Sequence, residues 1–239
     1  MAKPIKFKAL IVWESDDYIA LTKPSGISSL MERDLTKPSI LGLAKEYSPD
    51  AQLCHRIDKE TTGILMVAKN PEAYRNLAIQ FEGREVDKVY HAVVEGVHQF
   101  KDHLVDLPIL QNTKGMVRID KLLGKFAETT FNTVATYRRH TLVACEPVTG
   151  RMHQIRIHLA NANAPIVCDT AYGGNMVYLS DFKKHVNLKK YTEEQPLIKR
   201  FALHAYQIAF NDVQGKRVAL QAPYPKDFKA LVRQLEKYS

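Results

Sequence analysis

The segment His55–Asn70, HRIDKETTGILMVAKN, places charged and hydroxyl side chains directly before a compact apolar run. Asp58 lies there beside Arg56 and Lys59, and nearby cations favour the charged form of a carboxylate. A charged carboxylate at a fixed position can act as a nucleophile or as a general base. Loop aspartates also commonly close a turn or cap an element, so this segment alone leaves both roles open.

Other kinds of site are disfavoured by residue spacing. His153 and His158 are five positions apart, which separates them by about 140° on a helix and puts them on opposite faces of a strand. With His55 and Asp169 as the remaining ligand types, we expect no metal site. Neither GxxxxGK[ST] nor GxGxxG occurs, so we expect no nucleotide cofactor, and GxSxG is absent. A carboxylate site with arginine, tyrosine and histidine around it remains.

Charge indicates a class of partner. The 239 residues carry 34 Lys and Arg against 26 Asp and Glu, a net charge of +8 with a pI near 9.3. Such a surface attracts a polyanion without selecting a sequence, so RNA, DNA and acidic protein all stay open at this point. The apolar run Ala9–Trp13 is too short for a signal peptide or a membrane span, and we expect a cytoplasmic protein. The three cysteines form no CxxC pair, so we expect them to be reduced.

The elements that must position these residues follow from apolar periodicity and turn residues. Expected strands are Ala9–Trp13, Tyr18–Thr22, Ile64–Ala68, Lys88–Glu95, Thr129–Tyr137, Thr141–Pro147, Phe201–Phe210 and Arg217–Ala222. Expected helices are Ser39–Tyr47, Pro71–Phe81, Asp227–Tyr238 and the stretch after Gly150, whose Ile155, Leu159 and Ala162 form an apolar stripe. A strand is the alternative there, because Ile155, Ile157 and Leu159 also alternate.

Two segments carry weaker patterns. Phe100–Asp120 is loop-rich and is expected to hold one short strand, and the lysine-rich residues 178–200 form a possible mobile basic insertion. No internal repeat and no linker composition is evident. The pattern predicts a single α+β domain over residues 1–239, built mainly on antiparallel sheet with flanking helices.

Four segments together resemble the RluA-type RNA pseudouridine synthases. HRIDKETTG resembles the HR-L/I-D core and TG turn of that family, and Lys23–Gly26 resembles its KPxG turn. KVYHAVVEG at 88–96 resembles its KxYxAxVxG strand, and TGRMHQIRIH at 149–158 resembles its TGRxHQIRxH segment, followed by a PIxGDxxYG-like stretch at 165–173. The similarity spans about residues 11–228, in the family's order.

The resemblance implies an activity and a set of site residues. Carried over position by position, the catalytic aspartate is Asp58, the active-site tyrosine is Tyr90, and the arginine that pairs with the aspartate is Arg156. It further implies that Arg56 fills the gap left by a flipped base, and that His55, Arg151, His153 and Gln154 contact RNA. The implied substrate is structured RNA, ribosomal or transfer, with no cofactor and no metal.

The sequence departs from the family pattern at several positions. Met152, Asn163 and Cys168 replace the commoner residues of their motifs, with glycine being usual at the last two, which questions the local loop shape. About ten residues precede the catalytic segment, so we expect no S4 RNA-binding domain. We expect a monomer, without a protein partner and without contact to a membrane.

Two further hypotheses use the same residues. An RNA-binding or chaperone protein with this fold and no chemistry is expected to lack Asp58, Tyr90 or Arg156, and all three are present. A nucleoside or sugar hydrolase usually needs a second acid, for which Glu60 is the local candidate.

Overall fold

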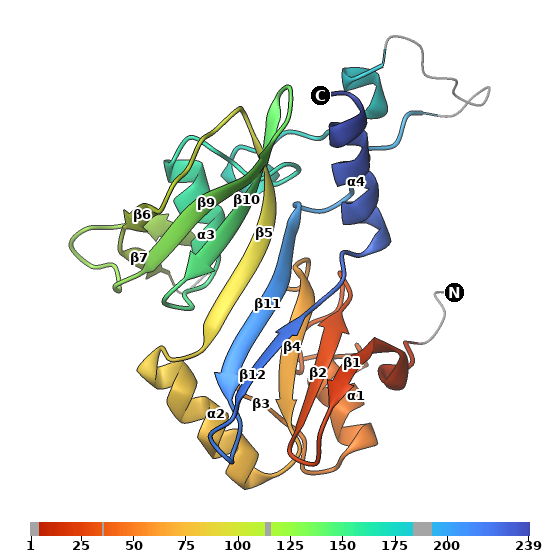
Figure 1. Cartoon of the computed structure of the whole chain (residues 1–239), viewed down its shortest axis with the longest axis vertical. Helices are drawn as coiled ribbons and strands as arrows, with labels where there is room; N and C mark the ends of the chain where they lie inside the picture. The colour runs from red at the N-terminus through yellow and green to blue at the C-terminus, as the bar shows by residue number, and fades with distance from the viewer. Residues whose placement is uncertain (1–4, 35, 113–115, 184–192) are drawn as a thin grey trace. The chain divides into compact units, whose positions relative to one another are not determined.

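The computed structural model describes residues 5–34, 36–112, 116–183 and 193–239, which form two compact units (Figure 1). The first unit comprises Met1–Val89 and His204–Pro223, and the second comprises Tyr90–Leu203 and Tyr224–Ser239. The α+β class with a mainly antiparallel sheet is confirmed. The extent of one domain over residues 1–239 stays a prediction.

The first unit is a sheet built around β4 (Thr62–Ala68), whose residues are all buried. Continuous Ile, Leu, Met and Val side chains explain that burial, because both faces of the strand are covered. Its other strands are β1 (Ile11–Glu14), β2 (Tyr18–Lys23), β3 (Gln52–Leu53), β11 (Leu203–Asn211) and β12 (Arg217–Gln221). Helices α1 (Ile40–Tyr47) and α2 (Pro71–Gly83) lie against β3, and α2 also contacts β4.

One pair of strands in this unit is parallel. Thr62 of β4 lies opposite His204 of β11, and Gly63 lies opposite Ala205. Gly63 has a φ of +112°, and a Cβ atom there would lie 2.1 Å from the Ala205 carbonyl oxygen. Only glycine fits this close approach, which explains the glycine of the TG turn.

The second unit is an antiparallel sheet in the order β5, β10, β9, β6. The elements are β5 (Asp87–Glu95, from Tyr90 onward), β6 (His103–Asp106), β7 (Ile109–Gln111), β8 (Val117–Ile119), β9 (Glu128–Thr136), β10 (His140–Pro147), α3 (Gln154–Asn161), η2 (Thr170–Tyr172), η3 (Leu179–Asp181) and α4 (Lys226–Lys237). Strands β7 and β8 form a separate hairpin. Apolar side chains of α4, including Phe228 and Leu231, are buried in the main core of this unit.

Several predicted boundaries are wrong. Residues Phe7–Leu10 form a short 3-10 helix η1, and the strand begins at Ile11. The described residues of the segment 100–120 form three short strands instead of the one predicted, because the β7–β8 hairpin pairs only three residues on each side and gives a weak alternation signal. The helix predicted after Gly150 is confirmed but begins at Gln154.

The predicted basic insertion at 178–200 is described only in part, since residues 184–192 lie outside the described residues. Near its end Lys199 is exposed, but Ile198 and Arg200 are buried. Ile198 is 1% exposed and Arg200 is 7% exposed, and the Leu197 N–H donates to the Val177 carbonyl at 2.8 Å. Arg200 therefore belongs to the core of the second unit and not to a solvated basic patch.

Candidate active site

Asp58 lies, partly exposed, in the loop between β3 and β4, and buried groups hold the backbone beside it. Ser29 Oγ donates to the Ile57 carbonyl at 2.8 Å and accepts from the Ile57 N–H at 3.2 Å. The Asp58 carbonyl accepts from the Thr61 N–H at 3.1 Å and so closes a turn. The backbone of Asp58 therefore closes a turn.

Lys23 holds the other side of this loop. It is 0% exposed, and its Nζ donates to the carbonyls of Lys59 at 2.7 Å, Ile27 at 2.9 Å and Pro24 at 3.0 Å. The Gly26 N–H donates to the same Lys59 carbonyl at 3.0 Å. The KPSG turn thus positions the residue that directly follows Asp58, a role that its motif alone did not indicate.

His55 has an intramolecular role in the structure. Its Nε2 accepts the Met66 N–H at 3.0 Å, which continues the pairing of β3 with β4 through a side chain. Because Nε2 accepts, the proton of the neutral ring lies on Nδ1. The ring stacks on Phe81 of α2 with centroids 4.8 Å apart. Burial, with a smaller effect of the Lys88 charge, lowers the pKa of His55 to about 3. Contact of His55 with RNA stays a prediction.

This pKa predicts a pH dependence of stability. The folded-state pKa of His55 lies below its unfolded value of 6.5, so the contribution is present above pH 6.5 and is lost as the pH falls toward 3. Between pH 7.5 and 5.5 we expect His55 to lower the free energy of unfolding by about 1.4 kcal/mol. Urea titrations of the wild type and His55→Gln, which keeps an acceptor but does not titrate, measure the difference. Equal losses in both proteins contradict the assignment.

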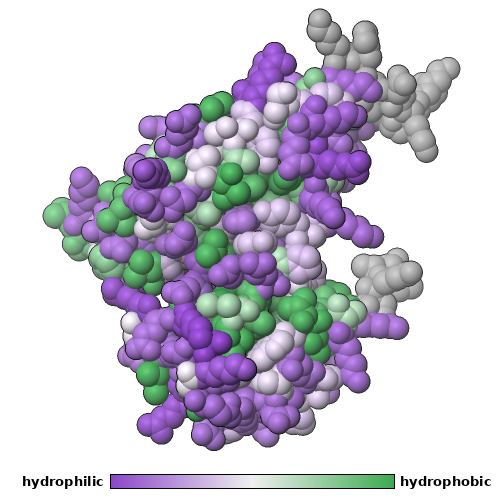
Figure 2. All heavy atoms as spheres, viewed as in Figure 1, coloured by the Kyte–Doolittle hydropathy of each residue, from purple (hydrophilic) through white to green (hydrophobic). Residues whose placement is uncertain are grey.

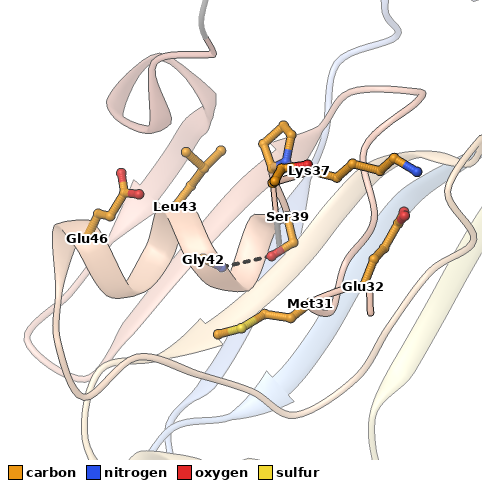
Figure 3. Close-up of a pocket in the computed structure, with 9 residues that line it drawn as sticks. Met31, Glu32, Lys37, Ser39, Gly42, Leu43 and Glu46 are labelled. Atoms are coloured by element: carbon orange, nitrogen blue, oxygen red, sulfur yellow. Dashed lines mark hydrogen bonds between the residues drawn. The ribbon is translucent and has the colours of Figure 1, made fainter. Parts of the chain in front are cut away.

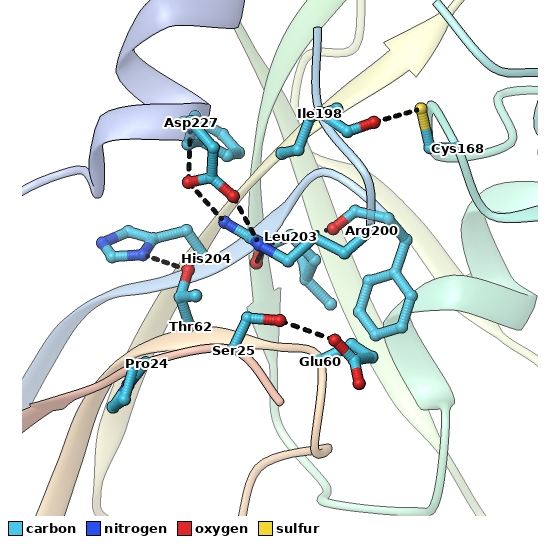
Figure 4. A network of polar contacts seen from close by, with 12 residues as sticks. Pro24, Ser25, Glu60, Thr62, Cys168, Ile198, Arg200, Leu203, His204 and Asp227 are labelled. Carbon is cyan, nitrogen blue, oxygen red and sulfur yellow. Dashed lines mark hydrogen bonds and ion pairs between the residues drawn. The ribbon is translucent and has the colours of Figure 1, made fainter. Parts of the chain in front are cut away.

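Of the other charged side chains in this loop, two contact other side chains of the protein. Arg56 is exposed, and its contact with RNA stays a prediction. Glu60 accepts from Ser25 Oγ at 2.6 Å (Figure 4). Lys59 Nζ lies 2.9 Å from the Glu32 carboxylate.

Glu32 also lines a cavity of about 290 Å³ beside α1 (Figure 3). Ser39 at its wall accepts the Gly42 N–H at 3.0 Å and caps the helix. Two of the lining side chains, Glu32 and Glu46, are acidic and one, Lys37, is basic, so the lining has a net negative charge.

The base of the loop is fixed where β4 and β11 meet. His204 is fully buried and its Nε2 donates to the Ala222 carbonyl at 3.1 Å. Its Nδ1 must then accept the Thr62 hydroxyl proton, at 2.9 Å (Figure 4). The LHA segment near the end of the chain therefore supports the TG turn after Asp58.

Tyr90 lies on β5 in the second unit, opposite Cys145 of β10. Its side chain is partly exposed and packs against the main core of that unit. The neighbouring His91 points to the other face of the strand and bonds to the Tyr224 hydroxyl. A flat ring at the border of the core can support a base by stacking.

Arg156 lies on α3 and is buried at 7% exposure. Its Nε donates to Asp169 Oδ2 at 2.6 Å and its Nη2 to Asp169 Oδ1 at 2.7 Å, a bidentate pair. Its guanidinium carbon lies 4.8 Å from the ring centroid of Tyr172 and 4.2 Å from that of Phe201. The predicted pairing of Arg156 with Asp58 stays a prediction. Within the second unit Arg156 pairs with Asp169, which belongs to the PIxGDxxYG-like stretch at 165–173.

Two of the positions at which the sequence departs from the pattern of the family that it resembles have a left-handed backbone. Asn163 and Cys168 have φ values of 57° and 63°, in the region that glycine adopts without strain. Tyr172 follows in η2, and its hydroxyl bonds to His153 Nδ1 at 2.9 Å. His153 is partly exposed, and its contact with RNA stays a prediction.

Gln154 is buried, and both ends of its amide are engaged within the chain. Oε1 accepts from Thr149 Oγ1 at 2.7 Å and from the Arg151 N–H at 2.9 Å. Nε2 donates to the Glu128 carbonyl at 2.9 Å and to Thr129 Oγ1 at 3.0 Å. These bonds position α3, so a contact of this side chain with RNA requires that some of them break.

Arg151 differs from Gln154 in being exposed. Its Nε donates to the Phe126 carbonyl at 3.0 Å, which leaves the outer guanidinium nitrogens toward solvent.

Among the described residues no three His, Cys, Asp or Glu side chains form a group able to hold a metal ion. In the same part of the chain, no helix has the length and apolar character needed to cross a membrane.

Comparison with known proteins gives one consistent result. A model of the RNA pseudouridylate synthase family matches residues 17–161. Ribosomal large subunit pseudouridine synthase C of Buchnera aphidicola is 33% identical over 238 residues, covering 97% of this chain and 72% of the relative. The protein of that name from Escherichia coli is 34% identical over 234 residues, covering 95% and 70%. Human RNA pseudouridylate synthase domain containing 4, at 24% identity, shares the fold with a TM-score of 0.71 over 96% of this chain and 95% of that one.

The chain belongs to the RNA pseudouridylate synthase family. It is a pseudouridine synthase, an isomerase that converts uridine in RNA to pseudouridine, and the RluA-type resemblance is confirmed.

Proposed function

We propose that this enzyme isomerises uridine in large-subunit ribosomal RNA with Asp58 as the catalytic carboxylate. The choice of RNA is supported by the relatives, which are named ribosomal large subunit pseudouridine synthases C and D. The choice of carboxylate is supported above all by the fixed backbone on both sides of Asp58, held by Ser29 and Lys23. Such positioning is what a catalytic group requires and a loop aspartate does not.

The reaction breaks the C1′–N1 bond, turns the uracil, and joins C5 to C1′; the proton on C5 leaves and N1 gains a proton, so no atoms are added overall. Asp58 serves either by attacking C1′ or by removing a sugar proton. Tyr90 supports the uracil face and Arg156 supplies positive charge to the carboxylate site. The target base must leave its stack, and Arg56, which is exposed, fills the space.

We expect Asp58→Asn to release no tritium from RNA labelled at uridine C5, because the group that acts on the sugar is lost. The variant retains the backbone contacts of the loop and is expected to fold normally. Asp50→Asn, at an exposed aspartate of the same unit, is the matched control and is expected to react like the wild type. Release by Asp58→Asn at the rate of the wild type contradicts the assignment.

The same assay separates the other hypotheses. Free uracil among the products indicates a hydrolase, in which case Glu60→Gln also abolishes the reaction. Binding without any tritium release by the wild type indicates a protein that uses the fold for RNA binding alone. Labelled transfer RNA, offered in parallel, shows whether ribosomal RNA is the preferred substrate.

A further inference from the structure

Two adjacent leucines are exposed in the turn that follows β8 in the second unit. Leu122 is 94% exposed and Leu123 is 70% exposed, and they lie in the sequence Lys121–Lys125, KLLGK, called here the KLLGK turn. Figure 2 shows hydrophobic residues beside hydrophilic ones at the edge of this unit where Figure 1 labels β6 and β7. Exposed apolar side chains that lie together commonly mark a surface that contacts a partner.

The KLLGK turn has a defined conformation. The Asp120 carboxylate accepts the N–H groups of Leu122 at 3.1 Å and Leu123 at 3.0 Å. The Gly124 N–H donates to the Asp120 carbonyl at 2.9 Å, and a Cβ on Gly124 would lie 2.3 Å from that oxygen. The turn therefore holds both leucines in solvent before any partner is bound.

The turn is also connected to the helix that carries Arg156. Lys125 and Ile109 exchange backbone hydrogen bonds of 2.9 Å in both directions. Ile109 packs with Ala127 and with Ile157 of α3, a small core that Tyr172 also contacts. A ligand bound to the KLLGK turn is thereby placed in a fixed relation to α3.

The charge around the leucines is positive. Lys121 and Lys125 flank them and are exposed, and Arg118 and Arg151 are exposed nearby in the same unit. The acidic side chain of the turn, Asp120, is only 16% exposed because it is used by the turn and by Arg118, at 2.8 Å. RNA combines phosphates, which the two lysines attract, with apolar base faces, which the two leucines can contact.

We propose that the KLLGK turn is an RNA-binding element in which Leu122 and Leu123 pack against unstacked bases and Lys121 and Lys125 contact phosphates. This inference rests on the proposed function, since it concerns the RNA on which the enzyme acts. The turn would bind RNA that flanks the target uridine. The small core around Ile109 holds the turn in a fixed relation to α3.

Two double variants separate the two kinds of contact. The probe is an in vitro transcript of large-subunit ribosomal RNA, and Kd is measured by filter binding at several salt concentrations. For Leu122→Ser with Leu123→Ser we expect Kd to rise by about tenfold at every salt concentration, with an unchanged slope of log Kd against log salt. For Lys121→Gln with Lys125→Gln we expect the slope to decrease by about 1 to 2, because up to two phosphate contacts are lost.

Leu104→Ser with Val134→Ser is the matched control, since these side chains are 54% and 50% exposed in the same unit. This control is expected to bind RNA like the wild type, and all variants are expected to keep the thermal midpoint. Unchanged Kd in the leucine variant, or an equal rise in the control, overturns the proposal. If Kd is unchanged, and if sedimentation shows dimers of the wild type but not of the leucine variant, the turn contacts a second copy of the chain instead of RNA. If the wild type releases no tritium, the proposed function is refuted. The Kd measurements still test RNA binding by the KLLGK turn, because they do not depend on the reaction.

Discussion

Asp169→Asn is expected to lower kcat on labelled RNA by about 100-fold, with KM changed by no more than a few fold. The Asp169 carboxylate binds both Nε and Nη2 of Arg156, and an amide offers one oxygen where two are needed. Arg156 is buried between two rings, so its guanidinium cannot find water as a substitute and must turn. A misdirected guanidinium no longer supplies positive charge to the carboxylate in the proposed reaction.

A general loss of stability has to be separated from this effect, because breaking a buried ion pair typically costs about 3 to 5 kcal/mol. Arg200 and Asp227 form a second bidentate pair in the same unit, with distances of 2.9 and 3.2 Å (Figure 4). Asp227→Asn makes the same chemical change at the start of α4 and is expected to reduce stability without changing kcat. Asp169→Glu, which restores the charge, is expected to recover part of kcat. Equal kcat in the wild type and Asp169→Asn excludes a positioning role.

Lys23→Met is expected to lower the free energy of unfolding by about 3 kcal/mol or more and to reduce kcat as well. Hydrogen bonds to a charged group contribute about 1.5 to 3 kcal/mol each, and Lys23 Nζ makes three of them to carbonyls while fully buried. Without them the Lys59 carbonyl loses one donor and keeps the Gly26 N–H, and the turn at Asp58 is less restrained. Urea denaturation and tritium release measure the two effects.

The control for this variant is Lys69→Met. Lys69 Nζ also binds a carbonyl, that of Ser15, and the Glu14 carboxylate at 3.0 Å, but its side chain is 24% exposed. Exposed pairs contribute about 0 to 1 kcal/mol, so we expect a small loss of stability and an unchanged kcat. If both lysine variants lose the same stability, the three carbonyl bonds of Lys23 do not hold the catalytic loop.

The sequence predicted the elements with strong periodicity and missed those that depend on pairing. The run Ile64–Ala68 and the strand KVYHAVVE were clear because long apolar or β-branched runs have few alternatives. The β7–β8 hairpin was missed because its short strands are specified by packing on Ile157 and not by their own pattern. The start of α3 was predicted several residues before Gln154. The helix begins only after His153, whose left-handed φ of 54° is not indicated by the sequence.

The supports of the candidate site were not predicted from the sequence. Asp58, Tyr90 and Arg156 were identified by resemblance to a family. The comparisons confirm the family, and the roles of the three residues stay predictions. Asp169 lies 13 positions after Arg156, and no local pattern joins a carboxylate to a guanidinium at that separation. Lys23 was unexpected for a different reason: a lysine before proline is typical of a surface turn, and complete burial is rare for lysine.

The bonds around Gln154 form part of a longer series with a single direction. The Arg151 N–H can only donate and the Leu107 carbonyl can only accept, at 2.9 Å from His158 Nε2. Between them Gln154 donates to Thr129 Oγ1, which donates to His158 Nδ1 at 3.0 Å. The two ends therefore determine the tautomer of His158 and the rotamer of every hydroxyl and amide in the series.

One added proton interrupts the single direction of this series. A proton on His158 Nδ1 turns an acceptor into a donor, so the Thr129 hydroxyl must rotate away and find another acceptor. Burial already lowers the pKa of His158, which keeps the ring neutral and the polarity intact. The helix that presents Arg156 is thus held by a set of bonds whose directions depend on one another, so replacing Gln154, Thr129 or His158 alone removes a donor or an acceptor on which its neighbour in the series depends.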